Sequence, residues 1–218
     1  MLDATTVAAH FLNALSNSKA ETAPYPHWLL SNMIPAATLA EIVKLPVPPP
    51  AINDTYGRRE THNSSRSFFA AKEQAEYACC RDLATALQSH EVVSQLEKTC
   101  NVNLKGSSLR IEYCLDTDGF WLEPHTDIGA KFFTMLIYLV DSPVDEYWGT
   151  DIYASPTDYV GTAPYAPNLG LIFIPGSDTW HGFKKRQITG VRRSLIVNYV
   201  TPEWRSRHEL AFPETPVA

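Results

Sequence analysis

The strongest constraint on the fold is a change of hydrophobic pattern near Gly106. After this residue the sequence contains runs rich in β-branched and aromatic residues, bounded by Gly, Pro, Asp and Asn as strands are. Because no long helical segment separates the runs, they favour a β sandwich or a jelly-roll barrel. The runs are residues 108–114, 132–140, 169–174 and 194–200.

The first half of the chain has helical periodicity instead. Apolar residues recur every three or four positions, which is the spacing of one helix face. Pro35 can begin one helix and Pro46 can end it, because proline fits the first turn of a helix but not its interior. We expect helices within residues 4–17, 35–45, 72–89 and 91–99, packed on one sheet of the β core.

Three connecting segments differ from these elements. Residues 46–50 contain four prolines, which predict a stiff connector. Residues 57–69 and 141–168 show no regular pattern, and long loops without structure of their own are often functional, so both are candidate lids.

Composition limits the class of protein. The chain has 218 residues, of which 44% are hydrophobic, and can bury one sizeable core. Its 18 basic and 24 acidic residues give a net charge of −6, which argues against nucleic acid or an anionic membrane as partner. Because no apolar run approaches a membrane span and no signal peptide is recognisable, we expect a cytoplasmic protein.

The four cysteines give no site. Cys79 and Cys80 are adjacent, and Cys100 and Cys114 are scattered, so the spacing matches neither a disulfide framework nor a zinc motif. We interpret them as small buried hydrophobic residues.

His125 and Asp127 form a candidate metal motif. If they lie on a strand, their side chains leave from the same face because successive Cβ atoms alternate. With a second imidazole they would complete the 2-His-1-carboxylate arrangement, which suits non-haem Fe(II) and leaves coordination positions open. The alternative for the pair alone is a surface turn with a solvated aspartate.

His181 can supply that second imidazole. It lies 54 residues after Asp127, just beyond an apolar run, so the fold could bring the two segments together. The alternative is a packed, hydrogen-bonded histidine beside Trp180.

Arg192 and Ser194 follow at the head of the last apolar run and share one strand face, whereas Arg193 points to the other. Fe(II) bound by one aspartate has a net charge of +1, and the near end of a chelating 2-oxo dicarboxylic acid would neutralise it. The far carboxylate would still need a cation, and arginine binds carboxylates through two parallel hydrogen bonds. The alternative, which we favour for Arg193, is an ordinary surface charge.

Taken together, His125-x-Asp127, His181 and Arg192-x-Ser194 resemble the Fe(II)/2-oxoglutarate-dependent oxygenase superfamily, particularly its prolyl 4-hydroxylase-like branch. The resemblance covers about residues 108–202, with a looser similarity at residues 26–30. The intact Asp127 argues against the halogenating members, which lack this carboxylate.

The resemblance implies a double-stranded β-helix (jelly-roll, cupin-like) core in a mainly β protein with flanking helices. It implies Fe(II) held by the His125, Asp127 and His181 side chains, and 2-oxoglutarate bound by Arg192 and Ser194. Tyr138 matches a tyrosine that often contacts the far carboxylate, although a core tyrosine is an equal alternative. In one domain, residues 1–218, we expect a helical and irregular support (1–105), the jelly-roll catalytic core (106–202) and a C-terminal tail (203–218).

The activity implied is hydroxylation of an unactivated C–H bond, with O₂ and 2-oxoglutarate consumed and succinate and CO₂ released. We expect a small-molecule substrate, with a protein side chain as the alternative. Residues that could line the substrate opening are Arg66, Arg110, Glu112, Tyr113, Trp121 and Asn198.

Two other functions remain open from the sequence. One is a cupin-like isomerase or hydrolase that uses the same three ligands with zinc or manganese and gives Arg192 no cosubstrate to bind. The other is a catalytically silent jelly-roll binding domain.

Overall fold

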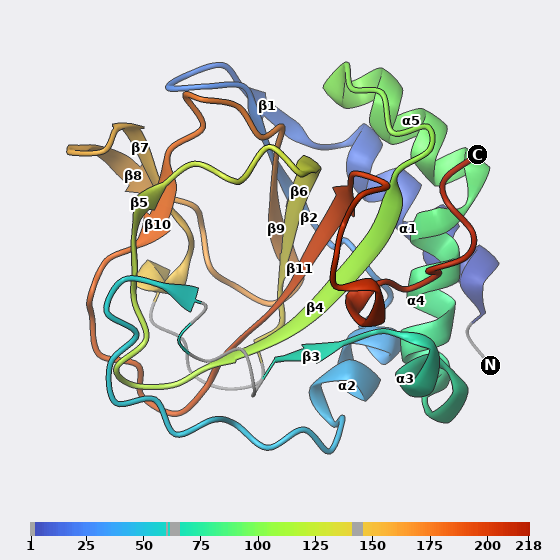
Figure 1. Cartoon of the computed structure of the whole chain (residues 1–218), viewed down its shortest axis with the longest axis horizontal. Coiled ribbons are helices and arrows are strands. Elements are labelled where there is room, and N and C mark those ends of the chain that lie inside the picture. The colour runs from blue at the N-terminus through green and yellow to red at the C-terminus, as the bar shows by residue number, and fades with distance from the viewer. Residues whose placement is uncertain (1–2, 60, 62–65, 141–145) are drawn as a thin grey trace.

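The computed structural model describes residues 3–59, 61, 66–140 and 146–218, and all the strand pairs in this part are antiparallel. The strands form two sheets (Figure 1). The larger sheet has seven, in spatial order β1 (Lys19–Glu21), β2 (His27–Ser31), β9 (Leu169–Phe173), β6 (Lys131–Tyr138), β11 (Arg192–Val200), β4 (Ser108–Asp116) and β3 (Ser67–Phe68). The smaller sheet has four, in the order β5 (Leu122–His125), β10 (His181–Phe183), β7 (Asp151–Ser155) and β8 (Asp158–Thr162).

The α-helices lie together on one side of the larger sheet (Figure 1). None of those in the described part of the chain combines the length and apolar character that crossing a bilayer requires. They are α1 (Ala4–Ser16), α2 (Ala36–Val43), α3 (Ala71–Glu76), α4 (Ala78–Gln88) and α5 (His90–Cys100).

Strand alternation divides the interior into two cores. On β11, Leu195, Val197 and Tyr199 face the helices and join their apolar residues in the larger hydrophobic cluster. The opposite face of the sheet meets the smaller sheet, and the second cluster includes Leu136, Tyr138, Leu171 and Phe173 from one sheet and Ile152 and Phe183 from the other. This is the jelly-roll arrangement with helices on one sheet that the apolar pattern favoured, and it agrees with the double-stranded β-helix that the resemblance implied.

The predicted helix over residues 72–89 is divided in the structure. Tyr77 has an extended backbone (φ −121°, ψ 117°) and separates α3 from α4. The buried side chain of Gln74 donates hydrogen bonds to the carbonyls of Phe69 and Ala211, both at 2.8 Å. These tertiary contacts fix α3 as a short helix separate from α4. No local sequence pattern predicts them.

The two candidate lids also differ from expectation. The described part of residues 141–168 contains a short 3₁₀ turn (Glu146–Trp148) and the β7–β8 hairpin, so it is not a structureless loop. Asp151 fixes this hairpin, because it accepts hydrogen bonds from the Thr162 hydroxyl and the Lys184 amide, each at 2.6 Å. In the other segment, β3 adds an edge strand beside β4. Residues 60, 62–65 and 141–145 lie outside the described part.

Gly149 leads directly to a stability prediction. A Cβ atom at this position would lie 1.7 Å from the carbonyl oxygen of Ala163, and backbone atoms must move to relieve that overlap. We expect Gly149→Ala to lower the free energy of unfolding by about 2 kcal/mol in urea titrations. Gly161 on the same hairpin has no atom within 4 Å of such a Cβ, so Gly161→Ala is the matched control. Equal effects of the two substitutions would contradict the packing assigned to Gly149.

Candidate active site

The two sheet strands β5 and β10 bring His125 and His181 together. These residues are paired across the strands, and their ring centroids are 4.4 Å apart. Asp127 lies just beyond the end of β5, not on it as the strand argument assumed. Potential ligand atoms of the three side chains all lie within 4.8 Å of one another, so they can bind a single ion.

The backbone orients both imidazoles. Nδ1 of His125 lies 2.8 Å from the carbonyl oxygen of Glu123, and Nδ1 of His181 lies 3.0 Å from that of Thr179. Each ring therefore donates its proton from Nδ1, which leaves the Nε2 lone pair for a metal. Burial lowers the pKa of His181 to about 4, with a smaller contribution from His125, so the ring is neutral, as a metal ligand must be.

The carboxylate of Asp127 is ionised and fixed by two donors. Lys131 Nζ lies 2.6 Å from one oxygen, and the hydroxyl of Thr134 donates to the other at 2.6 Å. Burial alone would raise the pKa of Asp127, but the charge of Lys131 and the hydrogen bonds from Lys131 and Thr134 lower it to about 2. Two imidazole nitrogens and one carboxylate are the donor set that suits Fe(II) with open positions.

A pocket of about 430 Å³ extends from these three residues between the sheets. Its volume lies in the range of small-molecule sites. Beyond the candidate ligands, its inner wall includes Leu136, Thr150, Phe183, Arg192 and Ile196.

Arg192 is buried in this pocket, with 3% of its surface exposed. Its Nε donates to the carbonyl oxygen of Trp148 at 2.6 Å, and its Nη1 lies 2.5 Å from a carboxylate oxygen of Asp116. The guanidinium also lies over the ring of Phe183, 4.5 Å from the centroid. Asp116 was not a sequence candidate, although it is the residue paired with Arg192 on the neighbouring strand.

Ser194 and Tyr138 lie beside Arg192 but differ in their contacts. The Ser194 hydroxyl is fully buried and has no hydrogen-bond partner within the described part of the chain, but neither Ser194 nor Tyr138 is among the residues that line the pocket. The Tyr138 hydroxyl instead lies 3.0 Å from the Thr150 hydroxyl and accepts from the Thr150 amide at 3.1 Å. Thr150 lines the pocket and was missed in the sequence, where it follows a loop-like segment.

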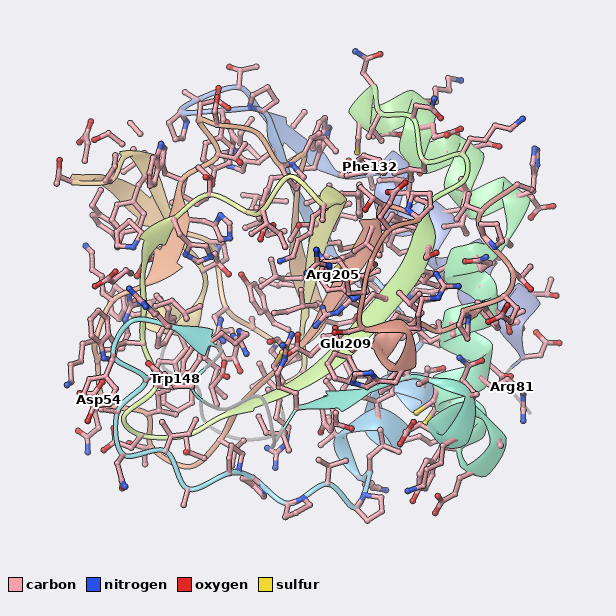
Figure 2. The ribbon with its side chains drawn as sticks, in the orientation of Figure 1. Asp54, Arg81, Phe132, Trp148, Arg205 and Glu209 are labelled. Carbon is pink, nitrogen blue, oxygen red and sulfur yellow. The ribbon has the colours of Figure 1, made fainter. Side chains whose placement is uncertain are left out.

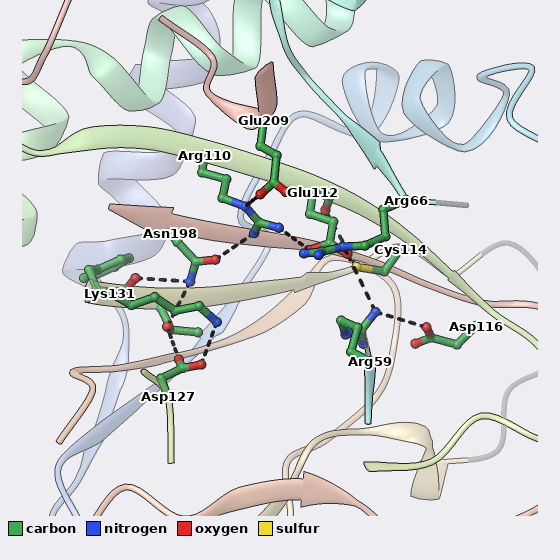
Figure 3. Close-up of polar contacts among 12 residues, drawn as sticks. Arg59, Arg66, Arg110, Glu112, Cys114, Asp116, Asp127, Lys131, Asn198 and Glu209 are labelled. Atoms are coloured by element: carbon green, nitrogen blue, oxygen red, sulfur yellow. Dashed lines mark hydrogen bonds and ion pairs between the residues drawn. The ribbon is translucent and has the colours of Figure 1, made fainter. Parts of the chain in front are cut away.

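Four of the substrate candidates form a buried polar network (Figure 3). Arg110 donates to Glu209 at 2.6 Å, Glu112 at 2.8 Å and Asn198 at 3.1 Å. Arg66 donates through two nitrogens to Glu112, at 2.9 and 2.8 Å. Glu209 comes from the short C-terminal turn beside β4 (Figure 2).

The same network reaches the candidate metal ligand. The Asn198 amide donates to the Thr134 hydroxyl at 3.0 Å, and Thr134 donates to Asp127. Arg66, Arg110 and Glu112 line the pocket, whereas Asn198 does not. The network therefore holds the carboxylate of Asp127 in place through a chain of buried hydrogen bonds.

The structure does not bring Tyr113 or Trp121 to the pocket. Tyr113 is adjacent to Glu112 on β4, so it points to the opposite face, where it packs near Phe69 in the helix-facing core. The indole nitrogen of Trp121 donates to Asp54 at 2.6 Å. The alternation of a strand already excludes placing Tyr113 on the same face as Glu112.

The network generates a pH-dependent stability prediction. Burial alone would raise the pKa of Glu112, but the guanidinium groups of Arg110, Arg66 and Arg59 hold that pKa below its ordinary value. A depressed folded-state pKa stabilises the protein above the unfolded-state pKa, and this stabilisation is lost as the pH falls. We expect Glu112→Gln to lower the free energy of unfolding by about 3 kcal/mol at pH 7.

The difference between this variant and the wild type should shrink at pH 3, as measured by urea unfolding at both pH values. Glu203 is exposed, and Glu203→Gln is the control. A penalty for Glu112→Gln that is the same at both pH values would show that the carboxylate charge is not the source of the stabilisation.

Comparison with known proteins supports the fold. No family model matches the chain, and no curated protein sequence matches it. Among solved structures, prolyl 4-hydroxylase from Phytophthora capsici matches with a TM-score of 0.59 at 11% identity, over 94% of this chain and 67% of that chain. A prolyl hydroxylase from Trichoplax adhaerens, in complex with a hypoxia inducible factor peptide fragment, matches with a TM-score of 0.57 at 12% identity, over 93% of both chains.

A Pseudomonas putida prolyl-4-hydroxylase matches with a TM-score of 0.53 at 13% identity, over 89% of this chain and 94% of that chain. At these identities the comparisons bear on the fold. The resemblance read from the sequence is therefore confirmed at the level of the fold: the chain has the double-stranded β-helix fold of these prolyl 4-hydroxylases.

Proposed function

We propose that this protein is an Fe(II)- and 2-oxoglutarate-dependent dioxygenase that hydroxylates an unactivated C–H bond of a small molecule. The observation that carries the proposal is the grouping of His125, Asp127 and His181 at one end of a pocket whose inner wall contains the buried Arg192. The fold of the solved neighbours supports the same class.

In this proposal the three side chains bind Fe(II) through two Nε2 atoms and one carboxylate oxygen. Fe(II) bound there would supply the oxidising chemistry: 2-oxoglutarate would lose CO₂, with one oxygen atom of O₂ entering the substrate and the other entering succinate. Lys131 and Thr134 hold the carboxylate of Asp127, so the ligand does not reorganise during turnover.

Arg192, which is buried in the wall of the pocket, would bind the far carboxylate of 2-oxoglutarate. We expect the hydroxyl of Thr150, which lines the pocket, to donate to it, and Tyr138 holds Thr150 in position. The Ser194 hydroxyl, which has no hydrogen-bond partner in the described part of the chain, lies on the same strand face as Arg192 but is not among the residues that line the pocket. The apolar side chains of Leu136, Phe183 and Ile196 limit the entry of water between the two ends.

A small-molecule substrate is supported by the size of the pocket, which must also accommodate 2-oxoglutarate. A peptide side chain is the alternative, since one structural neighbour is in complex with a peptide fragment. Succinate release and the gain of one oxygen in mass, followed with pooled metabolites and with peptide mixtures, distinguish the two.

The function is tested without knowing the substrate. Anaerobic Fe(II) and 2-oxoglutarate should give the wild-type protein a visible charge-transfer band, because the oxo acid chelates the metal. We expect Asp127→Ala and His181→Ala to abolish the band, as each removes a proposed ligand.

Asp158→Ala and His90→Ala replace exposed residues of the same types and should keep the band. A well-folded wild type without the band would favour the zinc or manganese cupin enzyme or the silent binding domain.

A further inference from the structure

Asp116 poses a problem for the binding of a diacid. It is buried, with 3% of its surface exposed, and its carboxylate lies against Arg192, the proposed partner of the far carboxylate. The two form a neutral pair. A second carboxylate brought to Arg192 would meet no net positive charge and would be repelled by Asp116, at a depth where charge repulsion is weakly screened.

Arg59 supplies the missing charge. Its Nη1 lies 3.4 Å from the second oxygen of Asp116 (Figure 3). Because Arg192 binds the first oxygen, one carboxylate is shared between two guanidinium groups. Nη1 also lies 3.9 Å from Glu112, but Arg66 and Arg110 already pair closely with that carboxylate. The group of Arg59, Asp116 and Arg192 therefore has a net charge of +1, which suits one further carboxylate.

Arg59 is placed to reach the ligand. It lines the same pocket as Arg192, and 21% of its side chain is exposed. Its guanidinium lies over the ring of Phe120 at 4.7 Å, that ring lies 5.7 Å from the ring of Phe183, and Arg192 lies over Phe183. The adjoining rings thus hold the two guanidinium groups in one region, and the Nε and Nη2 of Arg59 make no hydrogen bond within the described part of the chain.

We propose that Arg59 is a second cosubstrate-binding residue, which together with Arg192 binds the far carboxylate and makes the protein select a 2-oxo diacid over a 2-oxo monoacid. The inference rests on the proposed function. The alternative role for Arg59 is structural, in which it only neutralises Asp116.

The test compares two oxo acids that differ only at the far end. Anaerobic titration of the Fe(II)-loaded protein with 2-oxoglutarate and with 2-oxopentanoate, which has a methyl group in place of the far carboxylate, gives a Kd for each from the charge-transfer band. We expect Arg59→Met to raise the Kd of 2-oxoglutarate about 10- to 100-fold and to leave that of 2-oxopentanoate within about twofold. Arg59→Lys keeps the positive charge and should therefore raise the Kd of 2-oxoglutarate less than Arg59→Met does.

Arg81 is an exposed arginine that does not line the pocket, and Arg81→Met is the control for the loss of a positive charge elsewhere on the protein. It should change the two Kd values by about twofold or less. Equal weakening of both oxo acids by Arg59→Met, or no weakening of either, would overturn the proposal.

Asp116→Asn separates direct binding from neutralisation. Removing the competing carboxylate should lower the Kd of 2-oxoglutarate and leave the Kd of 2-oxopentanoate unchanged. In the Asp116→Asn background, Arg59→Met should still weaken 2-oxoglutarate about tenfold if Arg59 binds it directly. No weakening in that background would establish the purely structural role. A wild type that binds neither oxo acid would instead overturn the proposed function, and this inference with it.

Discussion

The pairing of β5 with β10 is the contact on which the candidate site depends. Its register sets His181 opposite His125, and each ring then donates to a carbonyl two residues before it. Gly182 permits the close approach, since a Cβ atom there would lie 3.0 Å from the carbonyl oxygen of Leu122 and 3.1 Å from that of Glu123. The two imidazoles among the proposed metal ligands are thus oriented by backbone groups, which move little once the sheet has formed.

Several buried charged side chains line the space between the two sheets. The inward positions of β4 include Arg110, Glu112 and Asp116, and those of β11 include Arg192 and Asn198. Burying these charges costs solvation free energy, and ion pairing offsets that cost only when the geometry is good. In return, the buried network fixes the position of the Asp127 carboxylate before a metal binds. A continuous chain of hydrogen bonds runs from Arg110 through Asn198 and Thr134 to this carboxylate.

Much of this arrangement could be predicted from the sequence. The apolar runs predicted the main strands of the larger sheet, and the period of three to four predicted α1, α2 and α5. Strand alternation placed Arg192 and Ser194 on one face. It also separates Glu112 from Tyr113, although both were substrate candidates. The short strands β7, β8 and β10 were not predicted, because each is only three to five residues long and contains no extended apolar run.

The sequence alone determined which chemical groups the chain carries and their order: a His-x-Asp motif, a later histidine and an arginine with a serine two residues on. It also determined the class of fold, because hydrophobic periodicity is a local property. Only the tertiary structure decided which groups meet. Asp116 forms ion pairs with both Arg192 and Arg59, and Thr150 lines the pocket beside Tyr138. These contacts depend on strand register and on the paths of the loops. Strand register and loop paths follow from the packing of the whole chain, so no local sequence pattern predicts these contacts.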